Sequence, residues 1–147
     1  MQFAELHKSL PFKTVEDYRN YLDRLDQFGD YTDQHISLLT EGIAEGNVLP
    51  SIVLEGYEET IAAHIVKDAQ KILLYSPFLK FSKAFTESEI IQLQDRARAS
   101  ITNIVIPAYT RFYDFMHRVY IPAARGTIGA SGLPDGRAFY RYRVQHF

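Results

Sequence analysis

The spacing of apolar residues constrains this chain most, because large apolar side chains recur every three or four positions over most of its 147 residues. That spacing places them on one face of an α-helix. Alternation over two positions, which is typical of a half-buried strand, occurs mainly in the last nine residues. We therefore predict an all-α fold of about four to five long, packed helices.

Local signals predict the ends of the first two helices. The first is expected over residues 15–28, because the side chain of Thr14 can cap the amide three residues on. Gly29 and Asp30 are expected to break the chain before a second helix over residues 31–45. That helix should stop at Gly46-Asn47, a pair suited to a left-handed C-terminal cap.

Two further helices are predicted from the apolar period. One runs from Pro50 to about residue 74, and residues 77–85 are expected to form a connection. Thr86 and Glu89 then have the spacing of a capping box that opens a long helix from residue 87. Pro107 should kink this helix rather than end it, because the apolar period resumes beyond the proline.

The end of the chain differs in composition from the rest. Residues 123–137 contain four glycines and one proline, which is typical of a loop. The final residues alternate aromatic and basic side chains and are predicted to be extended or irregular. We therefore expect a helical domain over residues 1–125, followed by a Gly-rich loop and an aromatic, basic tail over residues 126–147.

The charges are divided unevenly along the chain. The net charge is −2, which gives no reason to expect nucleic acid as a partner of the whole molecule. Residues 1–110 hold ten basic and sixteen acidic side chains, whereas residues 111–147 hold six arginines and two acids. Arginine suits paired hydrogen bonds to carboxylates or phosphates. The tail arginines are therefore the most distinctive charge feature of this sequence.

The sequence contains no recognisable catalytic or metal site. It has no cysteine, and its five histidines are at least 28 residues apart, so none begins an HExxH zinc motif. His64 with Asp68 and Asp114 with His117 could each supply two ligands, but a third is not apparent. We expect neither a catalytic nor a metal-binding residue in this chain, no membrane span, and no zinc bound by the chain alone.

The loop and tail leave several interpretations open. The loop lacks the lysine of a phosphate-binding loop, and Ser131 is not followed by the glycine of a nucleophile elbow. The tail could pack its aromatics structurally, bind nucleic acid, or wall a channel that receives a peptide carboxylate. The residues predicted to contact such a channel or another domain are Arg137, Tyr140, Arg141, Tyr142 and Arg143.

Five stretches of the sequence, taken in order, resemble the DUF885 family of bacterial proteins. Two strings carry most of the resemblance, GIAEGNVLP at residues 42–50 and GLPDGRAFYRYR at residues 132–143. The other three are PFKTVEDYRNYLDRL, SPFLKF and PAYTRFYDFMHRVYIPAAR. The resemblance implies an all-helical, gluzincin-like zinc metallopeptidase in which long helices wall a channel. It also implies a zinc-binding HExxPGH-like helix and a later glutamate, and no residue of this chain matches them.

The resemblance leads to a functional hypothesis. Family members are usually longer, so this chain is expected to be a helical fragment, inactive alone, that forms the scaffold or substrate-channel portion of a zinc metallopeptidase. Its partner would be the catalytic part of the same protein. The longer parent protein would in addition bind a peptide substrate. The resemblance favours a bacterial periplasm or cell envelope over the cytoplasm. The alternative is a free-standing helical interaction module that self-associates, for example as a homodimer.

Overall fold

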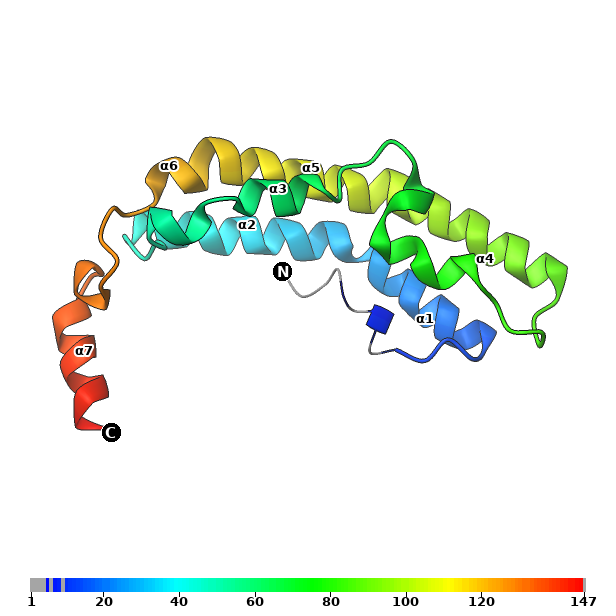
Figure 1. The fold of residues 1–147 in the computed structure, drawn as a ribbon, viewed down its shortest axis with the longest axis horizontal. Helices are drawn as coiled ribbons and strands as arrows, with labels where there is room; N and C mark the ends of the chain where they lie inside the picture. The colour runs from blue at the N-terminus through cyan, green and yellow to red at the C-terminus, as the bar shows by residue number, and fades with distance from the viewer. Residues whose placement is uncertain (1–4, 6, 9, 147) are drawn as a thin grey trace.

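The computed structural model describes residues 5, 7–8 and 10–146 and confirms the all-α prediction. The described part contains no β-strand, and its one isolated β-bridge joins Pro50 to Arg125. One long helical segment spans most of the molecule, and the helices that come before it in the chain pack along its side (Figure 1). These helices and the long segment together are called the body. The core lies along the inner face of this long segment.

The long segment is continuous from residue 87 to residue 123. It consists of α4 (Glu87–Ser100), a π-helical turn (Ile101–Val105), α5 (Ile106–Phe115), a second π-helical turn (Met116–Tyr120) and α6 (Ile121–Ala123). As predicted, the helix passes through Pro107 rather than ending there. The predicted capping box also forms, because the Glu89 amide donates to Thr86 Oγ1 at 3.3 Å and the Thr86 amide donates to the Glu89 carboxylate at 2.8 Å.

Both π-turns lie directly before an Ile-Pro pair. The Ile106 amide donates to the Ile101 carbonyl five residues back, and the Ile121 amide donates to the Met116 carbonyl in the same way. A proline inside a regular α-helix lacks the amide proton and clashes with the carbonyl four residues earlier. The wider turn adds one residue and changes which carbonyls are paired. We infer that these turns let the helix continue past Pro107 and Pro122.

The two N-terminal helices pack beside the long segment. In α1 (Val15–Asp26), the predicted cap forms, with the Asp17 amide 3.2 Å from Thr14 Oγ1. The Thr14 and Lys13 backbone amides donate to the Asp17 carboxylate, and these hydrogen bonds lower the pKa of Asp17. α1 is joined to α4 by Arg96, whose guanidinium is 2.6 Å from a carboxylate oxygen of Asp23.

The predicted break at Gly29 and Asp30 is wrong. Both residues lie inside α2 (Phe28–Ala44), and only Gln27 separates this helix from α1. The Phe28 side chain is fully buried, which holds the start of α2 against the core. A buried aromatic at the first turn therefore outweighs the low helix propensity of the next residue. The predicted end of α2 is confirmed, because Gly46 has a left-handed backbone with φ of 74°.

Replacing Gly29 with alanine should stabilise the protein. A Cβ at this position would lie 3.5 Å from Ile104 Cγ2, an ordinary van der Waals contact, and the glycine is in the first turn of α2. Alanine loses less backbone entropy on folding, so the free energy of unfolding should rise by about 0.5–1 kcal/mol. Urea denaturation followed by circular dichroism would measure the change, and a destabilised variant would contradict the packing described for Gly29.

The single helix predicted over residues 50–74 is also wrong. The segment contains a 3₁₀ turn (Ser51–Leu54), α3 (Tyr57–Ala62) and two more 3₁₀ segments (Ala69–Lys71 and Leu73–Leu79). Gly56 has φ of 74° and separates the first turn from α3, and Asp68 accepts a hydrogen bond from the Gln70 amide at 3.0 Å. Short turns can bury residues at spacings of three or four as a helix does. Of the residues that set the apolar period of this segment, Leu54, Ile61, Ala69 and Ile72 are accordingly buried, but Val53 is 57% exposed.

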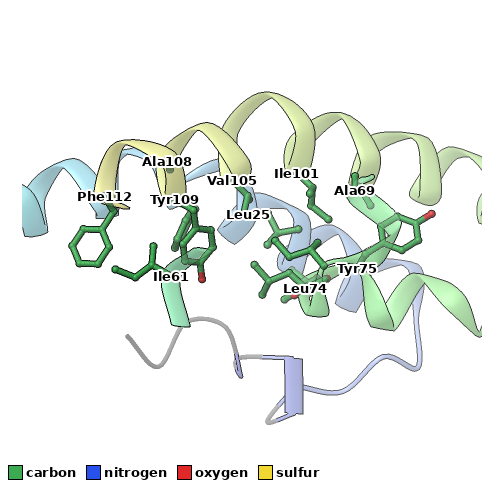
Figure 2. Packing of buried hydrophobic residues seen from close by; sticks show 14 of the residues in the cluster. Leu25, Ile61, Ala69, Leu74, Tyr75, Ile101, Val105, Ala108, Tyr109 and Phe112 are labelled. Atoms are coloured by element: carbon green, nitrogen blue, oxygen red, sulfur yellow. Dashed lines mark hydrogen bonds between the residues drawn. The ribbon is translucent and has the colours of Figure 1, made fainter. Parts of the chain in front are cut away.

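The core joins these segments to the long helix. Ile101, Val105 and Ala108 are fully buried and face the other elements of the body in Figure 2. Leu25 of α1 and Leu74 of the 3₁₀ segment, both fully buried, lie opposite them. The buried apolar residues of these segments and of the long helix thus form one continuous cluster.

The predicted extended or irregular tail is wrong as well, because most of it is helical. After a short 3₁₀ turn (Ala130–Gly132), residues Gly136–Gln145 form α7, which projects from the end of the body near α6 (Figure 1). Asp135 precedes α7 with a left-handed φ of 54°. The aromatic and basic alternation of this segment therefore reflects exposure on all sides of a helix, not the two faces of a strand.

Candidate functional site

All five residues predicted to contact a channel or another domain lie on α7. Arg137, Tyr140, Arg141, Tyr142 and Arg143 are exposed, as are Phe139 and Val144, and Gly136 is the buried residue of this helix. Tyr140 is 63% exposed and Tyr142 is 55% exposed. A surface helix ordinarily buries one apolar stripe against its own domain. The described body leaves the aromatic side chains of α7 uncovered.

The other three arginines of the basic segment do not belong to this surface. Arg111 makes a two-pronged contact with Asp33 of α2, because Nε donates to Oδ1 at 3.1 Å and Nη2 donates to Oδ2 at 3.1 Å. Arg118 lies 3.8 Å from Asp114 on its own helix. The +4 charge of residues 111–147 is therefore spread along the molecule, and α7 carries only part of it.

Arg125 fixes the start of the arm, which is the Gly-rich loop that carries α7. Its guanidinium donates to the carbonyl oxygens of Val48 at 3.0 Å and Gly129 at 2.8 Å, and also to the Thr127 carbonyl. Its backbone pairs with the segment after α2, with the Arg125 amide 3.1 Å from the Leu49 carbonyl. These hydrogen bonds hold the start of the Gly-rich loop against the end of α2. Sequence reasoning gave Arg125 no such structural role.

Neither weak metal pair forms a metal site. His117 Nδ1 contacts a Glu58 carboxylate oxygen, and Asp114 pairs with Arg118. The His64 ring instead stacks on Tyr109, with centroids 4.5 Å apart and planes inclined by 19°. Among the described residues, no group of three or more histidines and acids is placed to hold a metal ion.

A small pocket lies between α3 and α5 and was not anticipated from the sequence. It has a volume of about 120 Å³ and is lined by Tyr57, Thr60, Ile61, His64, Tyr109 and Phe112. Figure 2 shows Tyr109 and Phe112 reaching from the long helix toward Ile61. The sequence singles out His64 only through its spacing to Asp68, and no local motif links the two segments. The pocket depends on their pairing in space.

The polar groups of this pocket are partly buried and neutral. Burial lowers the pKa of His64, so its imidazole is uncharged near pH 7. Burial likewise raises the pKa of Tyr109, with smaller contributions from Tyr31 and Tyr57. The buried Tyr109 hydroxyl has no hydrogen-bond partner within the described part of the chain. The arrangement offers neutral hydrogen-bonding groups beside aromatic and aliphatic walls.

The family model for DUF885, described as bacterial protein of unknown function, matches residues 1–147. The chain belongs to the DUF885 family. No curated protein and no solved structure matches it. Within the described residues of this DUF885 chain, no helix is both long enough and apolar enough to cross a bilayer.

The two most specific strings of the DUF885 resemblance meet in space. Residues 42–50 form the end of α2 and the following turn, and residues 132–143 include the start of α7. A Cβ placed on Gly46 would lie 3.3 Å from Pro134 Cγ, so the two segments approach closely. The junction between body and α7 is thus built from both strings.

Proposed function

We propose that this DUF885 chain is a non-catalytic helical scaffold that walls part of a zinc metallopeptidase channel and docks through α7 onto the catalytic part. The observation that carries the proposal is the exposure of α7, on which Phe139, Tyr140, Tyr142 and Val144 are each more than half exposed. The peptidase chemistry itself comes from the family resemblance. A zinc ion and a peptide substrate would belong to the parent protein.

The chemistry of α7 supports a protein partner. Aromatic residues and arginine are enriched at the energetically important centres of protein interfaces. Arg137 and Arg141 are four residues apart on the same side of α7, and neither has an ion-pair partner among the described residues. An acidic surface with apolar pockets would complement this helix. The Arg125 contacts support the same proposal, because they hold the base of the arm in place.

The second candidate function is self-association, and exposed apolar residues near the base of α7 favour it. Leu49, Ile52 and Val53 are each at least half exposed, and they follow the end of α2. The acids Glu45 and Glu55 flank them in sequence. This segment could receive α7 of a second copy, forming a homodimer. Light scattering separates the two candidates, since a monodisperse monomer would contradict self-association.

The proposal is tested by extending the reading frame past codon 147 and expressing the whole protein. We expect an HExxH-like motif in the extension, stoichiometric zinc by mass spectrometry and hydrolysis of a peptide library. The chain of residues 1–147 should retain no stoichiometric zinc after dialysis and should hydrolyse no peptide. A frame without such a motif, or zinc or hydrolysis from residues 1–147 alone, would overturn the proposal.

The role of α7 needs its own variant. Arg137→Glu with Arg141→Glu in the whole protein should weaken the docking of α7, seen as faster proteolytic cleavage in the Gly-rich loop. Arg118→Glu is the matched control, because Arg118 is exposed and lies on the long helix outside α7. Equal cleavage of both variants would contradict docking through α7.

A further inference from the structure

The pocket between α3 and α5 is separate from α7 and is not part of the scaffold proposal. Ile61, Tyr109 and Phe112 are each at most 5% exposed and form its inner walls. His64 and Tyr57 are half-buried, and Thr60 is exposed. Buried walls with an exposed threonine at the side make the pocket a shaped site with an opening.

The lining of the pocket selects an uncharged ligand. It contains no acidic side chain, no lysine and no arginine among the described residues. Transfer of a charged group into such a site carries a large desolvation cost unless the charge is paired. Three of the lining residues are tyrosine or phenylalanine, whose rings contact a flat ligand over a large area. A neutral, aromatic ligand therefore has the smallest desolvation cost and the largest contact area in this pocket.

Two polar groups in this region have unused hydrogen-bonding capacity. The His64 imidazole has a ring contact with Tyr109, and neither it nor the Tyr109 hydroxyl has a hydrogen-bond partner within the described residues. A neutral imidazole carries one donor and one acceptor nitrogen. The Tyr109 hydroxyl is buried and unpaired among the described residues, which destabilises the free protein, whereas the half-buried His64 imidazole is open to a hydrogen bond from a ligand.

The volume limits the ligand to about one ring. The pocket holds about 120 Å³. A dry cavity of about 150 Å³ lined by aliphatic and aromatic side chains is known to bind benzene. Because this pocket is smaller than that cavity but has an opening beside Thr60, a single six-membered ring can enter it only with its substituent at the opening, and a fused-ring cofactor or a nucleotide is too large.

We propose that this pocket binds a phenol-type ring, whose face packs on Ile61 and Phe112 and whose hydroxyl hydrogen-bonds the His64 imidazole. Such a ring is found in a free small phenol and in a tyrosine side chain of a peptide. The inference does not depend on the scaffold or peptidase proposal, because binding is a property of these six residues.

The experiment titrates p-cresol, toluene and N-acetyl-tyrosine amide into the chain and follows the Ile61 methyl signals by NMR. We expect p-cresol to bind several-fold more tightly than toluene, because only p-cresol can pair with His64. Shifts with N-acetyl-tyrosine amide would assign the site to a peptide side chain, and shifts with p-cresol alone would assign it to a free phenol. Unmoved Ile61 signals with all three probes, or equal affinities for p-cresol and toluene, would overturn the proposal.

His64→Phe separates the hydrogen bond from the packing. The substitution keeps a ring beside Tyr109 but removes the hydrogen bond to the imidazole. The affinity for p-cresol should therefore fall about fivefold, which corresponds to roughly 1 kcal/mol, while the affinity for toluene stays unchanged. His35→Phe is the matched control, because His35 also contacts a tyrosine ring, that of Tyr31, but lies outside the pocket. Equal losses in both variants would contradict the role of His64.

A second variant remains informative if His64→Phe fails to fold. Thr60 is exposed at the side of the pocket, so Thr60→Trp should place an indole in the opening with little effect on the core. We expect this variant to lose binding of both p-cresol and toluene by at least tenfold. Unchanged binding of both ligands would show that they do not occupy this pocket and would overturn the proposal.

Discussion

Phe78→Ala is expected to reduce the free energy of unfolding by about 3–5 kcal/mol, a large share of the stability of a domain of this size. Phe78 is fully buried in the 3₁₀ segment Leu73–Leu79. Its ring lies 5.5 Å from Tyr18 and 6.0 Å from Tyr21, centroid to centroid, so it joins this segment to α1. Truncation leaves a cavity that rigid neighbouring rings cannot readily fill.

Leu79→Ala provides the matched control for this substitution. Leu79 is the next residue on the same segment, but it is 64% exposed, so its truncation should change the free energy of unfolding by less than about 0.5 kcal/mol. Urea denaturation of both variants, followed by circular dichroism, gives the comparison. Similar losses in the two variants would contradict the central position assigned to Phe78.

Hydrogen bonds reinforce the same junction and explain why it tolerates irregular backbone. The Tyr21 hydroxyl donates to the Leu74 carbonyl at 3.0 Å, and the Tyr18 hydroxyl donates to the Pro77 carbonyl at 3.2 Å. Both carbonyls lie in a 3₁₀ segment that contains a proline and cannot form a regular helical ladder. Side chains of α1 thus supply partners that the local backbone lacks.

Sequence reasoning succeeded where the deciding interactions are local. The two threonine caps and the left-handed Gly46 follow from residues within one turn of each helix end, and all three were predicted. It failed over residues 50–74, because a spacing of three or four residues does not distinguish one α-helix from successive short turns. The left-handed Gly56 and the Asp68 cap decide that difference.

The candidate sites show the same division. The exposed tail residues were selected from their composition, but their helical conformation was not predicted, because an exposed helix has no apolar stripe to reveal its period. The pocket between α3 and α5 joins residues 57–64 to Tyr109 and Phe112, about fifty positions apart. No spacing rule connects them. Only the packing of α3 on the long helix brings the two sets together.

Gly136→Ala is expected to unfold α7 while leaving the body intact. A Cβ at Gly136 would overlap the carbonyl oxygen of Ala130 and lie 3.0 Å from Ser131 Cα, and both are backbone atoms that cannot rotate away. The new Cβ can avoid these atoms only if α7 separates from the 3₁₀ turn Ala130–Gly132 on which it packs. A helix of ten residues without tertiary contacts is only marginally stable in water. The helical signal in circular dichroism should therefore fall by up to the contribution of α7.

The melting temperature of the body should meanwhile stay within about 2 °C, because a change that spares the core leaves nearly all of the unfolding free energy in place. Gly126→Ala is the matched control, since a Cβ there meets nothing within 4 Å and the residue lies in the same loop. Undiminished helicity in Gly136→Ala would show that the close approach to Ala130 is easily relieved. A large drop in melting temperature would instead mean that α7 stabilises the body. The expected result is lost helicity with an unchanged melting temperature. A variant with these properties should dock more weakly to a catalytic part and should also dimerise more weakly, because both interactions use α7. Binding of a ring in the pocket between α3 and α5 should persist, because the body stays folded.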